Sequence, residues 1–450
     1  MSPEKSIDLA SEVPRGWSAT KQAQAGIDAQ WIERFNDGRL NALAKEGLKN
    51  NGSIKAGTER LRQAQQRSKI TASAGRPQLG AGLNSSRQKD VFLGLGDVGN
   101  DMSAYSSYGV SVEASWEIDL WGRLKAARQA DIATFESQRW MQRGAEASLQ
   151  AQIAKAYFAL VESNQQIMLA ENTVDILAKT RDAIAERFNS ALSDEGGTAS
   201  QYRVAESDIE SARADLARWK GQRDGSARQL ELLIGRYPSA SISAAQVLPK
   251  LPSTPPVGLP SELLLRRPDI LAAERNYAAS LEQLEEARLA IFPTFALTAS
   301  TGTRSLELGN ILNSDFGVWS LGGALSQSIL TGGRLKAEKE IRDSEAKARL
   351  IELHDTVLTA FSEVETRLSA ETFLRERIDA TGKAFSLSKE AVETARVDYQ
   401  SGVSDIQTLL NAESRYIQTS SALVSLQRLA LENRIDLHLA LGGDFTPRQK

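Results

Sequence analysis

The sequence offers few side chains that could bind a metal or act as a nucleophile. It contains no cysteine, four methionines and two histidines, His354 and His438. Without cysteine there is no disulfide framework, no thiolate metal site and no cysteine nucleophile. Each histidine lies within a predicted helix and has no partner at ligand spacing. We therefore expect no metal site and no cofactor.

One glycine-rich stretch matches a nucleotide-binding pattern. Gly94, Gly96 and Gly99 fit GxGxxG, in which glycines let a pyrophosphate approach the start of a helix. Such a site needs a parallel strand before the glycines and a helix after them. Here "NDMSAYSSYG" follows, which is typical of a loop and then a strand, so we interpret 94–99 as a loop. Since no cluster of nucleophile, acid/base and binding groups is visible either, the sequence predicts a protein that is not an enzyme.

The charge balance argues against nucleic acid as a partner. The 450 residues include 54 Lys and Arg against 57 Asp and Glu, whereas phosphate binding needs a basic excess on some face. No window of roughly 18 uncharged apolar residues exists, which excludes a transmembrane helix but not the short alternating strands of a transmembrane barrel. The N-terminal "MSPEKSIDLASEV" lacks an apolar core. We therefore expect either a cytosolic protein or a mature form whose signal peptide has been removed.

Long helices must carry most of the chain. Apolar and small residues recur every seven positions from about Arg123 to Phe188, which predicts a coiled-coil helix. A turn-rich stretch, "NSALSDEGGTAS", separates it from a second helix over 198–234. The proline-rich segment 238–260 then forms a connector.

The second half of the chain repeats this plan. The five residues GRLKA occur at Gly122 and again at Gly333, 211 positions later, each time after an alternating apolar segment. A second heptad pattern follows, then the turn "QSGVSD" and a closing helix over 406–441. That helix ends at Gly442, which matches Gly235 at an offset of 207. The pattern indicates an internal duplication.

Two candidate strands precede each GRLKA, at 76–84 and 107–119 and at 292–301 and 318–330. Alternation is clearest in the second strand, where the side chains of Val110, Val112 and Trp116 share one face and Glu113 and Glu117 the other. Each pair is joined by a predicted loop, at 87–106 and 303–317.

Four amphipathic strands cannot close a barrel in one chain. An open sheet leaves unpaired edges, and an apolar face against lipid needs every backbone group paired, as in a closed barrel. Single-chain barrels begin at about eight strands. The pattern therefore predicts that several chains share one barrel, about eight strands in a dimer or twelve in a trimer.

Four stretches carry a family resemblance: "WIERFNDGRLNALAKEGLKNN", "WEIDLWGRLKAA", "LPSELLLRRPDILAAE" and "YQSGVSDIQTLLNAESRY". They resemble the TolC-like outer-membrane efflux factors, in particular the NodT-type branch, and the resemblance extends in order from Trp31 to Gly443. It implies an α+β membrane protein that forms a homotrimer. Each protomer would give four strands to one 12-stranded outer-membrane barrel and helices to a long periplasmic coiled-coil α-barrel, with an equatorial domain around it.

The resemblance also implies a function and partners. Such proteins are exit ducts of tripartite efflux pumps, coupled through a periplasmic adaptor to an inner-membrane transporter, here of the resistance-nodulation-division class. Outer-membrane lipid would surround the barrel. Many relatives carry a lipid-modified cysteine at the mature N-terminus. Since this chain has no cysteine, we expect that its signal and anchor were removed or replaced.

The resemblance divides the chain into eight segments. They are an N-terminal segment with a first helix (1–75), strands 1–2 (76–119), a first helical hairpin (120–235), a proline-rich equatorial crossover (236–262), a re-entering helix (263–291), strands 3–4 (292–330), a second hairpin (331–442) and a C-terminal tail (443–450).

Site residues follow from these placements. If the apolar strand face meets lipid, Glu113 and Glu117 point into the lumen, where threefold symmetry makes acidic rings and a cation-preferring channel. We interpret Gly122, Arg123, Gly333 and Arg334 as strand-to-helix junctions. The resemblance places a periplasmic gate at Asp405, Thr408, Asn411 and Arg415. It places the tip that docks an adaptor at Asp194, Glu195, Gly196, Gly197, Gly402 and Val403.

Two other functions remain open at this stage: a soluble coiled-coil scaffold, and a periplasmic adaptor. An adaptor usually has one helical hairpin, whereas this sequence has two by duplication, and amphipathic strands before each hairpin disfavour a scaffold. The sequence leaves the cargo open, because selection in such pumps belongs largely to the inner-membrane partner.

Overall fold

The computed structural model describes residues 14, 16–19, 31–91, 102–189 and 198–443. The chain divides into two compact units. We call Met1–Glu59, Trp140–Leu271 and His354–Lys450 the hairpin unit, and Arg60–Arg139 and Ala272–Leu353 the sheet unit. The glycine-rich stretch 94–99 lies outside the described residues.

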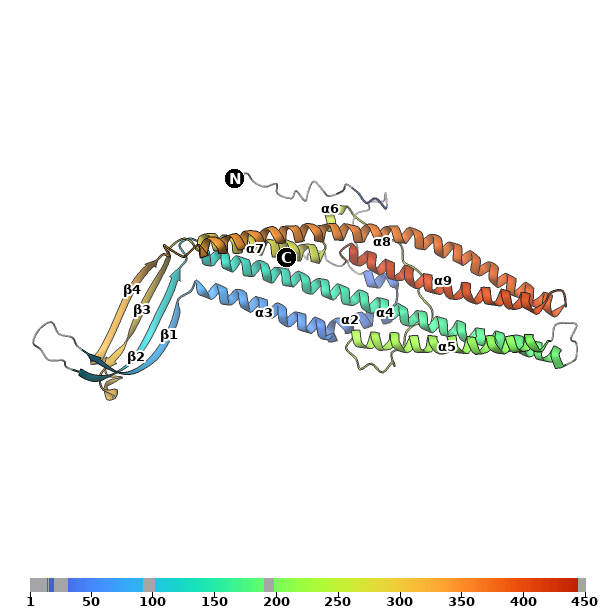
Figure 1. Cartoon of the computed structure of the whole chain (residues 1–450), viewed down its shortest axis with the longest axis horizontal. Coiled ribbons are helices and arrows are strands. Elements are labelled where there is room, and N and C mark those ends of the chain that lie inside the picture. The colour runs from blue at the N-terminus through green and yellow to red at the C-terminus, as the bar shows by residue number, and fades with distance from the viewer. Residues whose placement is uncertain (1–13, 15, 20–30, 92–101, 190–197, 444–450) are drawn as a thin grey trace, which may run out of the picture. The chain divides into compact units, whose positions relative to one another are not determined.

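The helices and strands follow the order expected for a duplication (Figure 1). The first half contains η1 (Trp31–Phe35), α2 (Gly38–Asn50), α3 (Gly52–Ala74), β1 (Gln78–Val91), β2 (Met102–Ile118), α4 (Arg123–Asn189) and α5 (Ala199–Leu233). The second contains α6 (Pro260–Leu263), α7 (Pro268–Leu289), β3 (Thr294–Ser305), η3 (Leu308–Asn310), η4 (Ser314–Phe316), β4 (Gly317–Ser326), α8 (Arg334–Gln400) and α9 (Ile406–Ala440).

The paired long helices have equal lengths in the two halves. Helices α4 and α8 have 67 residues each, and α5 and α9 have 35 each. Both α5 and α9 are followed, two residues beyond their last residue, by a glycine with positive φ, Gly235 at 78° and Gly442 at 89°. In both cases the N–H groups of that glycine and of the residue after it bond back into the last turn, which is the Schellman arrangement. Among the described residues, no helix combines the length and the apolar character needed to cross a bilayer.

The four strands form one antiparallel sheet in the order β1-β2-β3-β4. Directly opposed residues share a face, so the register assigns every side chain to one side. One face carries the apolar set, with Leu83 opposite Val110, Trp116 opposite Leu297 and Ala299 opposite Leu321. The other carries small and polar residues, with Gly80 opposite Glu113 and Ser300 opposite Ser320. The predicted alternation is therefore present in the sheet.

The strands differ in length from the prediction. The predicted loop 87–106 is too long, because β1 continues to Val91 and β2 begins at Met102. The reason is that Arg87–Val91 and Met102–Ser106 continue the same paired register, although their polar composition resembles a loop. Conversely, β4 ends at Ser326, before the predicted end at 330.

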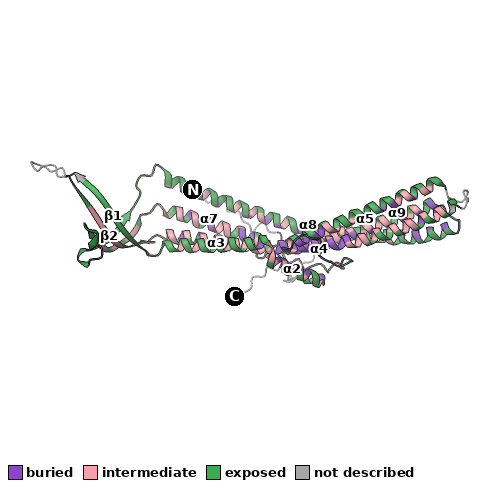
Figure 2. Ribbon diagram, turned by 90° about the horizontal axis from the view of Figure 1, so that it is seen from below, coloured by how far each residue is buried: buried purple, intermediate pink, exposed green. Residues whose placement is uncertain are grey.

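The core of the hairpin unit lies where η1 and α2 pack on α4, α5 and α9. Figure 2 shows buried residues concentrated on α4 near α2, whereas β1 and β4 are exposed and β2 and β3 are mostly of intermediate exposure. Trp31, Tyr157 and Phe158 are almost fully buried there. The Tyr157 hydroxyl donates to Asp37 Oδ2 at 2.6 Å, and burial together with that carboxylate raises the pKa of Tyr157.

The connector after α5 is held by a buried carboxylate. Glu231 accepts the backbone N–H groups of Ala240, Ser241 and Ile242 at 2.7, 2.8 and 3.1 Å. Burial of Glu231 opposes ionisation, but these N–H donors outweigh it and lower the pKa of the carboxylate. The duplicated position, 207 residues later, is His438, which stacks on Trp31 at 5.7 Å.

Candidate functional site at the hairpin tip

The turn from α8 to α9 is built by one glycine. Gly402 has φ 73°, which favours glycine. The N–H groups of Gly402 and Val403 bond back to the carbonyls of Tyr399 and Asp398, closing α8. The Val403 side chain is left 76% exposed at the end of the hairpin. The remaining predicted docking residues, Asp194, Glu195, Gly196 and Gly197, lie outside the described residues.

Asp405 is the N-cap of α9. Its carboxylate accepts the Thr408 hydroxyl at 2.7 Å and the Thr408 backbone N–H at 2.8 Å. Because both hydrogen bonds favour the ionised form, they lower the pKa of Asp405. The carboxylate is therefore charged and also stabilises the helix end.

Thr408, Asn411 and Arg415 form an exposed face of α9, which we call the gate stripe. Their spacing of three and four residues places them one above another on the helix. Asn411 Oδ1 accepts from Gln407 Nε2 at 3.4 Å, so this side chain is held along the stripe. The structure thus brings Asp405 and Thr408 into direct contact and places Asn411 and Arg415 on the turns that follow.

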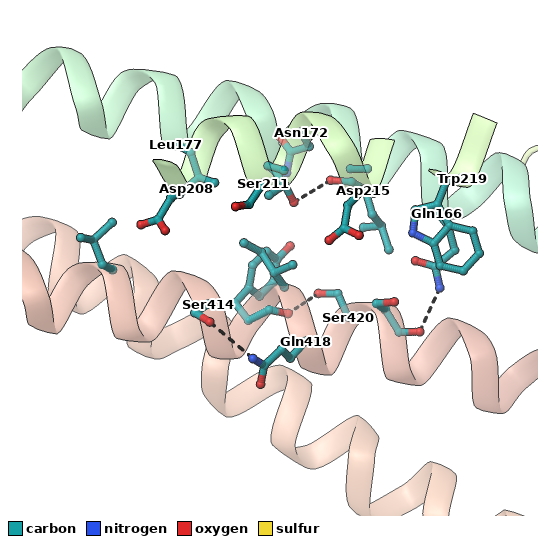
Figure 3. A pocket seen from close by; sticks show the side chains of 18 of the residues that line it. Gln166, Asn172, Leu177, Asp208, Ser211, Asp215, Trp219, Ser414, Gln418 and Ser420 are labelled. Carbon is teal, nitrogen blue, oxygen red and sulfur yellow. Dashed lines mark hydrogen bonds between the residues drawn. The ribbon is translucent and has the colours of Figure 1, made fainter. Parts of the chain in front are cut away.

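A cavity of about 530 Å³ lies beside the stripe, between α4, α5 and α9 (Figure 3). Asn411, Ser414 and Gln418 line it from α9, and Asp208, Ser211 and Asp215 line it from α5. Figure 3 shows Asp208 and Asp215 projecting from their helix into this space. Asp215 pairs with Arg218 at 3.1 Å.

Asp208 and Asp215 are not among the residues that the sequence predicted for the gate. Asp208 and Asp215 are one heptad apart with Ser211 between them, a spacing that puts all three on one helix face. This polar face of α5 could have indicated a polar cavity, but the spacing alone does not show which helix the face contacts. The residues of the gate stripe are neutral or basic. The acidic side chains that line the cavity come from α5.

The predicted lumen residues lie on the small and polar face of the sheet. Glu113 accepts from the Ser111 hydroxyl at 3.2 Å and lies opposite Gly80 and Ser300. Glu117 is paired with Arg123 at 2.7 Å. Glu117 therefore lies beside a neighbouring guanidinium, whereas Glu113 contacts the hydroxyl of Ser111.

The two GRLKA copies begin the two longest helices. Gly122 and Gly333 have φ of 87° and 86°, and α4 and α8 begin at the next residue, Arg123 and Arg334. A left-handed residue lets the chain turn sharply from extended to helical backbone. The arginines differ, because Arg123 pairs with Glu117 of β2 and Arg334 with Glu338 of its own helix at 2.8 Å.

Comparisons with known proteins give this arrangement its context. The profile of the family described as "Outer membrane efflux protein" matches residues 43–236 and 259–443. The chain is 30% identical to the outer membrane protein OprJ of Pseudomonas aeruginosa, over 97% of the chain and 91% of OprJ. It is 26% identical to the cation efflux system protein CusC of Escherichia coli K12, over 92% of the chain and 89% of CusC. The open-state MtrE outer membrane channel of Neisseria gonorrhoeae matches in structure with a TM-score of 0.83 and 29% identity, over 99% of the chain and 98% of MtrE.

The chain belongs to the outer membrane efflux protein family. It is an outer-membrane efflux channel of a tripartite pump and extends into the periplasm, and the family is not enzymatic. The resemblance and fold class predicted from the sequence are confirmed, and the scaffold and adaptor alternatives are set aside.

Arg267 links three helices through its guanidinium group. Arg267 precedes α7, and its guanidinium bonds Asp269 at 2.6 Å, Glu363 at 2.7 Å and the Ala440 carbonyl at 3.2 Å. Burial disfavours its charge, but the two carboxylates outweigh that effect and raise its pKa. Arg267 therefore ties the end of α9 to α7 and α8.

Proposed function

We propose that the channel is a homotrimer in which three copies of the sheet form one closed barrel. The observation that carries this proposal is the two-faced sheet with both of its edge strands, β1 and β4, unpaired within the described residues. Its apolar face exposes Trp319, Leu321 and Leu325 by 67 to 80%. Joining β4 of one copy to β1 of the next removes every edge and turns the face that carries Leu83, Trp116 and Leu321 toward lipid.

A matched pair of lysine substitutions tests the barrel. Leu321→Lys puts a charge on the apolar face and Ser320→Lys puts it on the polar face of the same strand. A lysine facing the membrane interior costs about 2–4 kcal/mol, and less toward the interfaces. We expect wild type and Ser320→Lys to be extracted by detergent as SDS-resistant trimers, and Leu321→Lys to lose trimer. A monodisperse wild-type monomer that needs no detergent would refute the proposal.

The two hairpins form the periplasmic duct, and their tips dock a periplasmic adaptor that joins an inner-membrane transporter. Support comes from the family and from the exposed apolar Val403 beside Gly402 at the turn. Crosslinking through a photoreactive residue at 403 should capture the adaptor in cells, whereas the same residue at Leu387, also exposed on α8 but farther from the turn, should capture much less.

Glu113 makes the lumen cation-preferring. In a trimer its carboxylate is repeated three times on the small polar face, while Glu117 is paired with Arg123. Reversal potentials in planar bilayers should show cation preference that Glu113→Gln reduces more than Glu117→Gln does. Anion preference of the wild type would contradict this assignment.

The cargo is selected by the inner-membrane transporter. Relatives of similar identity differ in their named cargo, since CusC is a cation efflux protein and TtgF of Pseudomonas putida a toluene efflux protein. The described residues contain no group of three or more His, Cys, Asp or Glu that could hold a metal ion. Exchanging the cognate transporter for another, with the same channel, should therefore change the exported compounds.

A further inference from the structure

Glu413 is a buried carboxylate behind the gate stripe. It lies two residues after Asn411 and two before Arg415 on α9, and only 2% of its side chain is exposed. Two residues turn the direction of a helical side chain by about 200°. Glu413 therefore faces the interior of the tip while the stripe faces away from it.

The contacts of Glu413 join α9 to two other helices. The Thr180 hydroxyl of α4 donates to its two carboxylate oxygens at 3.4 and 3.5 Å. Nη2 of Arg396, on α8, lies 3.6 Å from Oε1, and the Arg396 side chain is 47% exposed. These distances are long for charge-assisted hydrogen bonds, which are usually about 2.7–2.9 Å. The carboxylate is thus enclosed without strong compensation.

The rest of its surroundings is mostly apolar. Ile184 of α4, Ala205 of α5, and Ala395 and Tyr399 of α8 form the buried cluster at this end, together with Ile406 and Leu409 of α9. Tyr202 of α5 packs against the same cluster. Among the described residues, Arg396 is the charged group that acts on Glu413, and Tyr202 and Tyr399 are the other titratable groups of the cluster.

We infer that Glu413 is a positioning residue for the gate, which holds the tip of α9 against α4 and α8 when protonated and releases it when ionised. This inference rests on the proposed function, because it takes the gate stripe as the constriction of the duct. Burial raises the pKa of Glu413, and Arg396 and Thr180 only partly oppose that rise.

The sign of the effect follows from linkage. A pKa that is raised in the packed tip means that packing favours the protonated carboxyl. The stabilisation is complete below the ordinary glutamate pKa of about 4.3 and is lost as pH rises through the raised value. Each unit of the rise changes the ratio of packed to open tips by about tenfold. Raising the periplasmic pH should therefore loosen the gate.

Conductance against pH tests the inference on the reconstituted trimer. Wild-type open probability should rise as the pH rises from acid to neutral. Glu413→Gln keeps the shape and removes the charge, so its open probability should stay at the acid level at every pH. Glu390→Gln, an exposed carboxylate on α8, removes the same charge and should follow the wild-type profile. A profile of Glu413→Gln identical to that of wild type would overturn the inference.

A distance measurement makes the outcome independent of conduction. The chain has no cysteine, so spin labels at Lys179→Cys on α4 and Gln418→Cys on α9 report the tip separation directly, in trimers diluted with unlabelled protomers. The separation should increase with pH and stay constant in Glu413→Gln. Glu413→Ala, which loses the contacts with Thr180 and Arg396, should show the larger separation already at acid pH. If the distances shift with pH but the protein conducts no ions, the proposed function is refuted and the inference is not. If the distances do not change with pH, the inference is refuted.

Discussion

The two ends of α9 are held by different chemistry. At the base, near Gly442, Arg434 is almost fully buried against Glu371 and the Pro252 carbonyl, and Asp436 pairs with both Lys155 and Arg367. Farther along, Arg428 pairs with the buried Glu162 of α4 at 2.5 Å. Nearer the tip, Glu413 makes the charged link of α9 among the described residues, with partners at 3.4 to 3.6 Å, and the hydroxyls of Ser388 on α8 and Thr419 on α9 share a hydrogen bond of 2.8 Å.

This difference shows how one helix can serve a channel that opens at one end. Buried charge pairs are costly to break, because each leaves an uncompensated charge behind. Long contacts to a partly exposed arginine are worth little. The base of α9 is therefore fixed to α4 and α8, and the tip is the end at which separation costs least.

The largest expected effect comes from breaking the base. Arg434→Ala leaves the Glu371 side chain, which is 10% exposed, without its partner and should destabilise the channel by about 3–5 kcal/mol. The matched change at the tip, Arg396→Ala, removes a half-exposed partner and should cost about 0–1 kcal/mol, because Glu413, whose pKa is raised by burial, can take up a proton instead of remaining an unpaired charge. Thermal melting of helical circular dichroism in detergent measures both. Equal losses would show that the two ends are held equally.

Glycines at the two ends give the next comparison. Gly442 and Gly402 have φ of 89° and 73°, so alanine at either costs about 1–2 kcal/mol of left-handed strain. At Gly442 a Cβ would lie 3.0 Å from Arg266 Cβ, whereas at Gly402 no atom lies within 4 Å. Crowding of this kind adds about 1–3 kcal/mol. Gly442→Ala should therefore lower the melting temperature more than Gly402→Ala, and the reverse order would mean that the base relaxes easily.

Much of this architecture could be predicted from the sequence, and the reasons are local. Heptad spacing, glycines at helix ends and alternating strands determine elements within a few residues, as the start of α4 at Arg123 and the end of α5 before Gly235 show. The face of each strand residue follows from a period of two.

The contacts between distant elements could not be predicted. Glu413 and Thr180 are 233 positions apart, and nothing in the spacing of either predicts that they meet. Similarly, nothing in the sequence distinguishes Glu231 from other helical glutamates, yet its carboxylate accepts hydrogen bonds from three backbone N–H groups of the connector. Long-range pairing depends on how helices are rotated against each other, which a heptad pattern restricts but does not specify.

The pH dependence of stability should have opposite signs at the base and at the tip of α9. Packing lowers the pKa of Glu231 at the base, so its stabilisation is present above the ordinary glutamate value of about 4.3 and is lost as pH falls through the lowered pKa. Packing raises the pKa of Glu413, so its stabilisation is present at low pH and is lost as the pH rises. Glu231→Gln should cost about 1–2 kcal/mol at neutral pH, because its amide replaces an acceptor of three N–H groups.

Melting temperatures of wild type and Glu231→Gln from about pH 3 to pH 7 measure this difference. The gap between them should be widest at neutral pH and close as the pH falls below about 4. A gap that stays constant with pH would mean that Glu231 acts through its shape and not through its charge.

Substitution of Asp405 should have the smallest effect on stability. It is also the most direct test of the gate. Its carboxylate both caps α9 and places a charge beside the gate stripe, so Asp405→Ala should raise single-channel conductance or antibiotic leakage. Asp405→Asn separates the two roles, because asparagine caps a helix nearly as well but carries no charge. Leakage in both variants assigns the gate to the charge, and leakage in the alanine variant alone assigns it to the cap. Unchanged conductance in Asp405→Ala, Thr408→Ala and Asn411→Ala would move the constriction away from this stripe, and the acidic cavity wall of Asp208 and Asp215 on α5 would then be the next position to test.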